Sequence, residues 1–290
     1  MTASAPGGAE TLAEAYRHCA ALARDNARDQ WLGALYAPAA SRNALYALAC
    51  FDHEIRQARL RARDPNLAAI RIAWWREAAL GGREGEAAAS PVALALRAAI
   101  EAFALPAEPI EAMTDAQLIE IAPPNDFLLA AFERYAADSE GARLRLASRI
   151  ASGGADLDAA EAHAPAGLAL ALARMLARLP FEAGADRVLF PDDALTRHGV
   201  GRADLDARSA SPGMVAACAD LRCLARDRLL EAERRLKTSP TPILPAFVPL
   251  GALRLDLNRL ERNGARPFDP PAEPSALRRQ WAIWRWARRF

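Results

Sequence analysis

The residues best suited to proton transfer form one short polar run inside an apolar segment. His53 and Glu54 are adjacent there, and a histidine beside a carboxylate can act as a general acid and base. Adjacent helical residues point about 100° apart, however, so these two side chains rarely act on one substrate. Asp52 and Glu54 form the nearest acidic pair, but i, i+2 spacing also directs them to different helix faces. A polar helix surface is therefore the favoured interpretation.

A second chemically distinctive segment lies at the C-terminus, where residues 278–290 contain five arginines and three tryptophans. On a helix, Trp281 and Trp284 share a face, whereas Trp286 points away from it. A basic helix that carries tryptophans can lie in a membrane interface. It can equally dock on the rest of the protein, and docking is slightly favoured. The residues assigned to either contact are Trp281, Trp284 and Arg285.

The four cysteines offer no pattern for metal binding. Cys19, Cys50, Cys218 and Cys223 form no CxxC pair and have no histidine at ligand spacing, so we expect no zinc site. Their neighbours are apolar. The cysteines are therefore predicted to be small core residues in a reducing compartment.

The elements that must position all these residues are helices. Alanine and leucine are abundant, both are strong helix formers, and β-branched residues are scarce. Pro180 is expected to end a helix that begins at Asp156, and residues 181–201 are expected to form a loop. The predicted helices cover residues 11–29, 39–60, 66–80, 91–104, a segment opened by Pro106 and Pro109, 126–151, 156–179, 212–237, 245–262 and 275–288.

Composition narrows the class of protein. The chain has 290 residues, of which 52% are hydrophobic, and no break in composition separates two domains, so residues 1–290 are predicted to form one all-α domain. A net charge of +1 indicates no nucleic-acid partner. Residues 1–10 are expected to be disordered and lack the features of a signal peptide. No window has 18 apolar residues without a charge, so we expect no membrane-spanning helix. We therefore expect a cytoplasmic protein, with residues 265–290 as a basic, Trp-rich helix at its end.

Five segments carry a pattern that runs in one order along the chain. It combines an aromatic-rich entry, a helix with the sequence R-x-A-L-Y-A, and a later helix followed by a Phe-Pro turn. The segments are residues 29–38, 41–48, 50–59, 70–77 and 167–192. In this order the pattern resembles the squalene/phytoene synthase family. The resemblance implies an isoprenoid-synthase-like, single-domain helical bundle with a central cavity.

The chemistry of that family implies a particular set of ligands. Its enzymes join two prenyl diphosphates head to head, and the reaction begins with loss of a diphosphate group. Mg²⁺ ions neutralise the leaving group and require carboxylate oxygens. Two helices therefore each carry Asp-x-x-x-Asp, because i, i+4 spacing places both carboxylates on one helix face.

This sequence departs from the family at those positions. In the alignment that the resemblance implies, Arg56 and Leu60 replace the first pair of aspartates, and Arg178 and Glu182 stand at the second. A fixed positive charge beside a metal site repels the cation, so we predict no metal site and no cofactor, with Mg²⁺ only if the chain is active. The altered motifs comprise Glu54, Arg56, Gln57 and Leu60 in the first helix and Arg174, Arg178 and Glu182 in the second.

The arginines at these positions suggest a second use of the site. Arg56, Arg178 and Arg187 are candidates for binding an anion such as diphosphate without a metal. Arginine is common throughout the chain, however, so a structural role for each of them is favoured.

One branch of the family resembles the sequence better than the enzymes do. Mitochondrial complex I assembly factors and their alphaproteobacterial relatives share the fold and lack the aspartates. Residues 51–55, 176–181 and 198–200 are similar to the motifs of that branch. This resemblance implies a role in biogenesis of the respiratory NADH dehydrogenase, at the inner membrane, with complex I subunits as partners.

Three hypotheses follow. The first is a catalytically degenerate protein that assists assembly of respiratory complex I. The second is an active head-to-head prenyltransferase of isoprenoid biosynthesis. The third is a protein that binds an isoprenoid lipid without converting it, in a cavity bordered by small residues such as Ala47, Ala49 and Ala171.

Overall fold

The computed structural model describes residues 6–62, 64–157, 160–184 and 188–289. Within them the chain forms fifteen α-helices, one π-helix and one 3-10 helix, and no strand. The α-helices are α1 (Pro6–Asn26), α2 (Arg28–Ala34), α3 (Ala39–Arg61), α4 (Pro65–Ala79), α5 (Glu84–Ala89), α6 (Pro91–Ala102), α7 (Ala107–Ile121), α8 (Leu129–Ala136), α9 (Ala142–Ala151), α10 (Ala160–Glu182), α11 (Asp192–Thr196), α12 (Arg202–Asp206), α13 (Pro212–Leu236), α14 (Leu250–Arg262) and α15 (Ala276–Ala287). The π-helix is η1 (Ala137–Gly141) and the 3-10 helix is η2 (Thr241–Phe247).

Capping residues and prolines fix where several helices begin. Asp64 precedes Pro65, and its carboxylate accepts a hydrogen bond from the backbone N–H of Asn66 at 2.8 Å. Ser211 precedes Pro212 in the same way and caps Met214 at 3.2 Å. Proline suits the first helical turn because its missing N–H would have no partner there. These starts agree with the predicted ones to within a residue.

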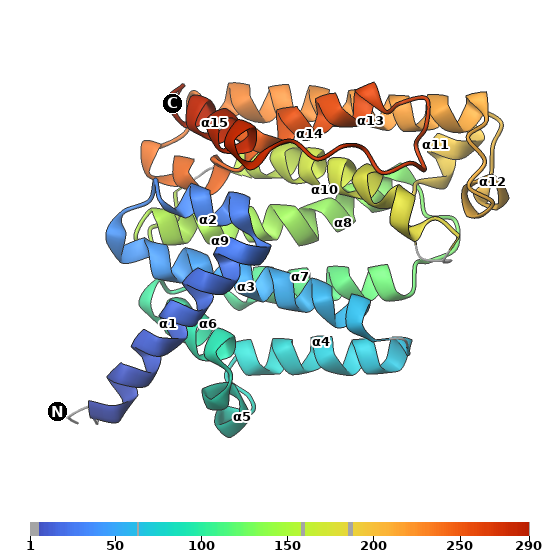
Figure 1. The fold of residues 1–290 in the computed structure, drawn as a ribbon. Coiled ribbons are helices and arrows are strands. Elements are labelled where there is room, and N and C mark those ends of the chain that lie inside the picture. Colours follow the sequence, from blue (N-terminus) through green and yellow to red (C-terminus); the bar gives the residue numbers. More distant parts are fainter. Residues whose placement is uncertain (1–5, 63, 158–159, 185–187, 290) are drawn as a thin grey trace.

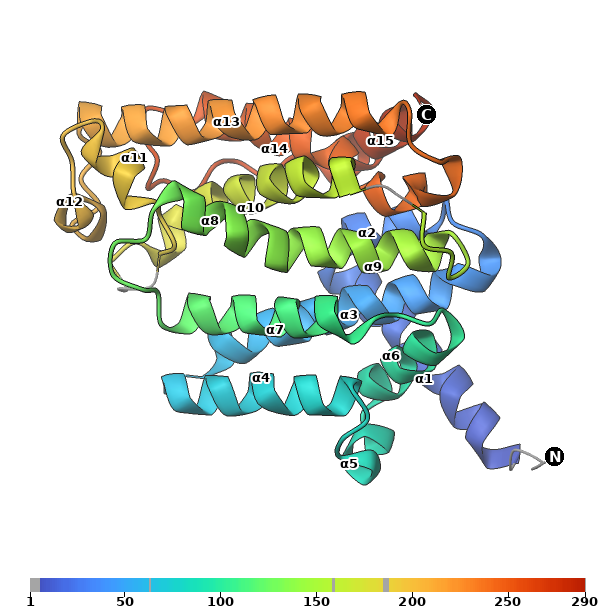
Figure 2. The same ribbon diagram turned by 180° about the vertical axis from the view of Figure 1, so that it is seen from behind.

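The helices are stacked in tiers, with α10 in the middle of the bundle (Figures 1 and 2). The long helix α13 and the C-terminal helices α14 and α15 lie on one side of α10. On its other side lies the continuous segment α8–η1–α9, followed by α3 with α7, and then by α4 and α6. The first and second altered motifs therefore come from α3 and α10, which stand on opposite sides of α8–η1–α9.

The predicted helix over residues 126–151 is wrong in detail. Asp126 has a φ of 54°, in the left-handed region, so no helix begins there. The helix starts at Leu129 and is interrupted by η1, where one turn is wound more widely than in an α-helix. This widened turn carries Glu140 and ends at Gly141.

Pro180 does not end its helix, which corrects a second prediction. Helix α10 continues to Glu182, with Pro165 and Pro180 inside it. Pro180 lies in the last turn of α10. A proline there removes one backbone hydrogen bond, but few helical residues follow that it could disturb. Its carbonyl accepts a hydrogen bond from Arg208 at 2.9 Å. The extra turn brings Glu182 to the same side as Arg178.

The predictions for both ends also need correction. Residues 1–10 were expected to be disordered. Residues 1–5 lie outside the described residues, but helix α1 begins at Pro6, so the prediction is wrong for residues 6–10. At the C-terminus, the basic helix is shorter than residues 265–290, because Ser275 caps α15 through the N–H of Arg278. The residues just before it run as an extended connection along α14 (Figure 1).

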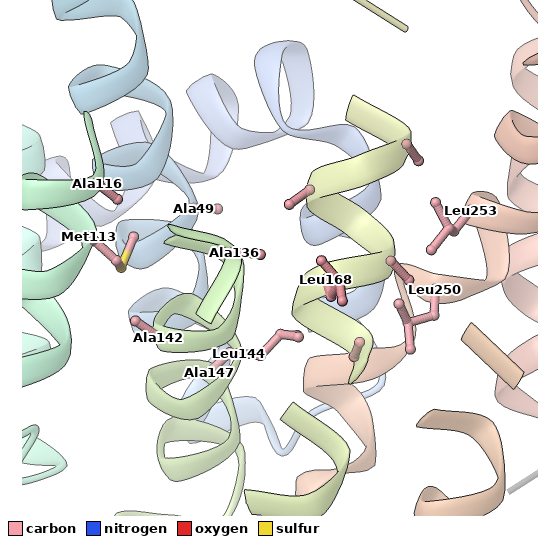
Figure 3. Packing of buried hydrophobic residues seen from close by; sticks show 14 of the residues in the cluster. Ala49, Met113, Ala116, Ala136, Ala142, Leu144, Ala147, Leu168, Leu250 and Leu253 are labelled. Carbon is pink, nitrogen blue, oxygen red and sulfur yellow. The ribbon is translucent and has the colours of Figure 1, made fainter. Parts of the chain in front are cut away.

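The core is built largely from small side chains, which lets the helices approach closely. Figure 3 shows Leu168 of α10 between Leu250 and Leu253 of α14 on one side and alanines of α8 and α9 on the other. One such close approach joins Gly167 to Gly141. A Cβ atom at Gly167 would lie 2.8 Å from the backbone nitrogen of Gly141 and 3.0 Å from its Cα. Helix α10 therefore packs directly on the π-helix.

The cavity beside Ala49, one of the small residues named above, is small. It is bordered by Leu48, Ala49, Arg143 and Ala147 and has a volume of about 20 Å³, room for about one water molecule. Ala47 and Ala171 are fully buried among neighbouring helices. A larger cavity, of about 420 Å³, is bordered by residues of η1, α9 and α10, and another, of about 460 Å³, by residues of α14 and the connection to α15.

Candidate functional site

Ten polar side chains meet in the interior, where α3, α7, η1 and α10 come together. We call them the ion-pair cluster. Five are arginines, four are carboxylates and one is a tyrosine. They are Asp52, Arg56, Arg59, Glu120, Tyr135, Glu140, Arg143, Arg174, Arg178 and Glu182.

Glu140, on the π-helix, is the centre of one half of the ion-pair cluster. Its Oε2 accepts hydrogen bonds from Nε and Nη2 of Arg143 at 2.9 and 2.8 Å. Its Oε1 accepts from Nη2 of Arg56 on α3 at 3.2 Å and from Nη1 of Arg174 on α10. One carboxylate therefore joins three guanidinium groups from three helical segments.

Glu120 and Glu182 form the other half. Nη2 of Arg59 lies 2.9 Å from Oε1 of Glu182 and 3.2 Å from Oε2 of Glu120. Nη1 of Arg178 donates to Oε2 of Glu120 at 3.0 Å, and its Nε donates to Oε1 of Glu182 at 2.8 Å. These contacts connect α3, α7 and α10 across the bundle.

Tyr135 links the two halves. Its hydroxyl donates a hydrogen bond to Oε1 of Glu120 and accepts one from Nη2 of Arg174 at 2.8 Å. Arg174 also bonds to Glu140, so a continuous chain of hydrogen bonds runs from Glu140 to Glu182. Such a network stabilises a buried polar site only when nearly all of its members have partners.

Burial and charge together set the protonation of the first half. Burial disfavours the ionised form of Glu140, but Arg143, Arg174 and Arg56 outweigh it and hold the pKa of this carboxyl well below its usual range. Burial likewise disfavours the charged form of Arg56, yet Asp52 and Glu140 raise its pKa above the usual value. Glu140 is therefore a carboxylate and Arg56 a cation at neutral pH.

The five guanidinium groups of the ion-pair cluster exceed its four carboxylates by one charge. Two buried donors, Nη1 of Arg56 and Nε of Arg59, have no hydrogen-bond partner among the described residues. Nε and Nη2 of Arg56 and Nη2 of Arg59 donate to carboxylates. The excess charge is thus spread over guanidinium groups that are partly occupied by carboxylates.

The ion-pair cluster does not fit Mg²⁺. A magnesium site requires carboxylate oxygens free to coordinate the ion. Each of the four carboxylates instead accepts a hydrogen bond from at least one arginine, and Glu140 accepts from three. In the part of the chain that the structure describes, no three His, Cys, Asp or Glu side chains group as metal ligands would. Five guanidinium groups at this point would also repel the ion.

The structure brings together four of the residues selected from the sequence. Arg56, Arg174, Arg178 and Glu182 all belong to the ion-pair cluster. On α3, the inward positions are Asp52, Arg56 and Arg59, at spacings of four and three residues, so the face that points inward begins one turn earlier than the alignment implied.

The other selected residues of the first motif lie outside the ion-pair cluster. Leu60 has 57% of its surface exposed, and Glu54 forms an ion pair with Arg61 at 3.3 Å. Gln57 is partly buried on α3. Arg187, the third candidate for anion binding, lies outside the described residues. His53 is half-buried, and burial lowers the pKa of its imidazole.

Sequence reasoning missed six members of the ion-pair cluster. A local signal existed for three of these, because Asp52 pairs with Arg56 at i, i+4 and Arg143 pairs with Glu140 at i, i+3. The missed residues are Asp52, Arg59, Glu120, Tyr135, Glu140 and Arg143.

The second candidate region, at the C-terminus, is docked by its inner face. Ile283 and Trp286 of α15 are buried, and Arg279 bonds to Asp29 and Asp256. Trp281 and Trp284 point away from the bundle and are largely exposed. The helix therefore docks without using the two tryptophans that were assigned to this contact.

The helical architecture and the position of the ion-pair cluster define a class: proteins with the isoprenoid-synthase fold. Residues 23–285 match the family described as squalene/phytoene synthase. This chain belongs to that family.

Curated relatives of similar length come from animals. The protein named NADH dehydrogenase (ubiquinone) complex I, assembly factor 6, of Homo sapiens is 25% identical over 253 residues, covering 87% of this chain and 76% of that protein. The protein of the same name from Mus musculus is 23% identical over 268 residues, with coverages of 92% and 79%.

Solved structures share the fold. A dehydrosqualene synthase in complex with ligand superposes with a TM-score of 0.80 at 18% identity, covering 98% of this chain and all of that one. The squalene synthase HpnC from Alicyclobacillus acidocaldarius gives a TM-score of 0.74 at 20% identity, with coverages of 89% and 97%. The ion-pair cluster is thus a set of charged side chains placed on the backbone fold of these proteins.

Glu182 gives the ion-pair cluster a pH dependence that can be measured. Burial raises the pKa of Glu182 to about 7, although Arg59 lowers it in part, compared with 4.5 in the unfolded chain. The folded protein therefore holds a proton that the unfolded chain releases, and this contribution to stability is lost as pH rises from about 4.5 through 7. Glu182→Gln has a neutral side chain at every pH, so it does not lose this contribution. The free energy of unfolding of the variant minus that of the wild type is therefore expected to be roughly 2 kcal/mol higher at pH 8 than at pH 5.

Urea unfolding at the two pH values measures this difference. Glu84→Gln, at an exposed position in the first turn of α5, is the matched control for the general effect of removing a carboxylate. An offset between Glu182→Gln and wild type that stays constant from pH 5 to pH 8 would contradict the assignment.

Proposed function

We propose that this chain is a catalytically inactive member of the squalene/phytoene synthase family that assists assembly of a complex I-type NADH dehydrogenase. One observation carries the first part of the proposal. The carboxylates of the ion-pair cluster are all bonded to arginines, so none of them is free to hold the Mg²⁺ that ionisation of a prenyl diphosphate needs.

The second part of the proposal comes from similarity. Relatives that cover most of this chain are named complex I assembly factors. A protein that acts by binding other proteins needs a stable fold and a specific surface, and the ion-pair cluster contributes only to the first. Its partners are then subunits of the NADH dehydrogenase, and it works as a cytoplasmic protein at the inner membrane.

The catalytic alternative is tested directly. Purified protein incubated with Mg²⁺ and farnesyl or geranylgeranyl diphosphate is expected to release no diphosphate above a protein-free control. A squalene synthase of the family, assayed in parallel, supplies the positive control. Release by the wild type that disappears in Arg56→Ala or Glu182→Ala, with both variants still helical by circular dichroism, would establish an active prenyltransferase and overturn the proposal.

The assembly role is tested in the native host. Deleting the gene is expected to reduce fully assembled NADH dehydrogenase on native gels, and to reduce NADH oxidation by membranes in proportion. Restoring the wild-type gene should restore both. A deletion strain with normal amounts of the assembled enzyme would contradict the assembly role, whatever the result of the diphosphate assay.

The third hypothesis, a carrier of isoprenoid lipid, is the weaker alternative. A C15 or C20 chain needs a pocket of several hundred Å³, in the range usual for small-molecule sites. The cavity at Ala49 has only about 20 Å³. The cavity of about 420 Å³ bordered by η1, α9 and α10 is large enough, but it is lined in part by the charged residues Asp138, Arg145 and Arg149, which suit an isoprenoid chain poorly. Lipid that copurifies with the protein and is identified by mass spectrometry would favour this hypothesis over the assembly role.

A further inference from the structure

Helix α15 presents an apolar and aromatic face that the protein does not cover. Leu277, Trp281 and Trp284 have 80%, 56% and 43% of their surfaces exposed. They occur at i, i+4 and i+7, so they form one stripe along the helix. The opposite face already holds the helix in place through Ile283 and Trp286. The exposed stripe is therefore not needed for docking.

Arginines accompany each exposed tryptophan. The guanidinium carbon of Arg285 lies 4.6 Å from the ring centroid of Trp281, and that of Arg288 lies 4.9 Å from Trp284. These cation–π contacts hold the rings against the helix and keep a positive charge beside each. Indole rings with a neighbouring cation are typical of surfaces that enter the interfacial region of a bilayer.

Two cavities flank the helix and are rich in arginine. One, of about 460 Å³, lies between α14 and the connection to α15 and is bordered by Arg259, Arg262, Arg266 and Arg278, with Glu273 as its only acidic residue. The other, of about 240 Å³, is bordered by Arg254, Arg278, Arg285 and Arg289 and by no acidic residue. Leu255 and Arg278 border both, so the two cavities adjoin beside the exposed stripe.

Several of these arginines are free to bind an external anion. Arg254, Arg259 and Arg266 form ion pairs with Glu233, Glu273 and Asp269. The remainder form no ion pair with a described carboxylate. They are Arg262, Arg278, Arg285, Arg288 and Arg289. Unpaired guanidinium groups beside cavities are suited to phosphate oxygens, which they bind through paired N–H groups.

We propose that the exposed face of α15 and its two flanking cavities bind the surface of an anionic phospholipid bilayer. The indoles of Trp281 and Trp284 enter the interfacial layer, and lipid phosphates occupy the arginine-lined cavities. An acidic protein surface would satisfy the arginines but not the exposed Leu277 and tryptophans, whereas a bilayer satisfies both. Helix α10 is the only described helix apolar enough to span a bilayer, but 67% of its most apolar window is buried in the bundle, so it is not available for this contact.

Sedimentation with lipid vesicles tests the proposal on the full chain. The wild type is expected to bind vesicles of phosphatidylcholine with 30% phosphatidylglycerol, and to bind pure phosphatidylcholine vesicles far more weakly. Raising the salt from about 0.1 to 0.5 M should weaken binding, because screening shortens the reach of the charges. Equal binding to both kinds of vesicle, or no binding to either, would overturn the proposal, and the second result would favour an acidic protein as the occupant.

Two variants separate the charges from the indoles. Arg278→Gln/Arg285→Gln/Arg289→Gln is expected to weaken binding to anionic vesicles roughly 100-fold. Trp281→Ala/Trp284→Ala should weaken it and abolish the blue shift of tryptophan fluorescence on vesicle binding. Phe181→Ala, an equally exposed aromatic on α10, and Arg17→Gln are the matched controls and should bind as wild type.

Both variants change exposed side chains, and thermal unfolding verifies that the fold is intact. Vesicle binding that both variants retain in full would locate the membrane contact elsewhere and contradict the proposal. These outcomes are independent of the assembly role, because they need neither the NADH dehydrogenase nor a host strain.

Discussion

Replacing Glu140 with alanine is expected to lower the free energy of unfolding by about 3–5 kcal/mol. Among the described residues, Glu140 is the only carboxylate that bonds to Arg143, and it also bonds to Arg56 and Arg174. Its removal leaves three buried guanidinium groups with too few partners. Breaking a buried ion pair from one side is costly for this reason, even where the intact pair contributes little.

Urea unfolding followed by circular dichroism measures this effect. Glu140→Gln keeps the shape but removes the charge, so its loss of stability should be smaller than that of Glu140→Ala. Glu108→Ala removes the partner of Arg145 at an exposed position, and should cost less than about 1 kcal/mol. A loss of less than 1 kcal/mol for Glu140→Ala would show that the ion-pair cluster does not stabilise the fold.

The second large effect is expected at Gly167. A Cβ atom there would lie 2.8 Å from the nitrogen and 3.0 Å from the Cα of Gly141, and 3.2 Å from the carbonyl oxygen of Ala136. All three are backbone atoms, so no side chain can move aside. Gly167→Val should therefore separate α10 from the π-helix and cost about 3 kcal/mol, with Gly167→Ala costing less.

Thermal and urea unfolding of these variants provide the test. Gly85→Ala is the control, because a Cβ atom at Gly85 of α5 would meet nothing within 4 Å. This substitution should be neutral or raise the stability by up to about 1 kcal/mol. A Gly167→Val protein as stable as the wild type would show that α10 and the π-helix can separate without cost.

Most helices could be predicted because their ends are marked in the sequence. Asp64-Pro65, Ser90-Pro91 and Ser211-Pro212 are cap and first-turn pairs, and α3 lies almost where it was expected. The π-helix could not be predicted, because it depends on the contact between Gly141 and Gly167, which are distant in sequence. The continuation of α10 through Pro180 likewise depends on tertiary contacts.

The two altered motifs could be located from the sequence, but not the site that they form. Arginines at 56, 174 and 178 were recognised as departures from a metal site. Glu120 carries no such signal, because α7 alone does not indicate which of its faces points inward. The amphipathic pattern of α8 marks the face that holds Tyr135 as buried, but it does not show that Tyr135 meets charged side chains there. The carboxylates that neutralise the arginines come from helices that lie next to α3 and α10 only in the folded chain.

The ion-pair cluster also restricts how this chain can change. Converting Arg178 alone to aspartate would place three carboxylates together, with Glu120 and Glu182 losing a partner. Converting Arg56 alone would set two aspartates one turn apart and remove one contact of Glu140. A return to metal-dependent chemistry would thus require several substitutions at once, and each single step would pass through a less stable protein. The inactivity proposed above would therefore be maintained by the requirements of folding, without any selection against the enzyme activity itself.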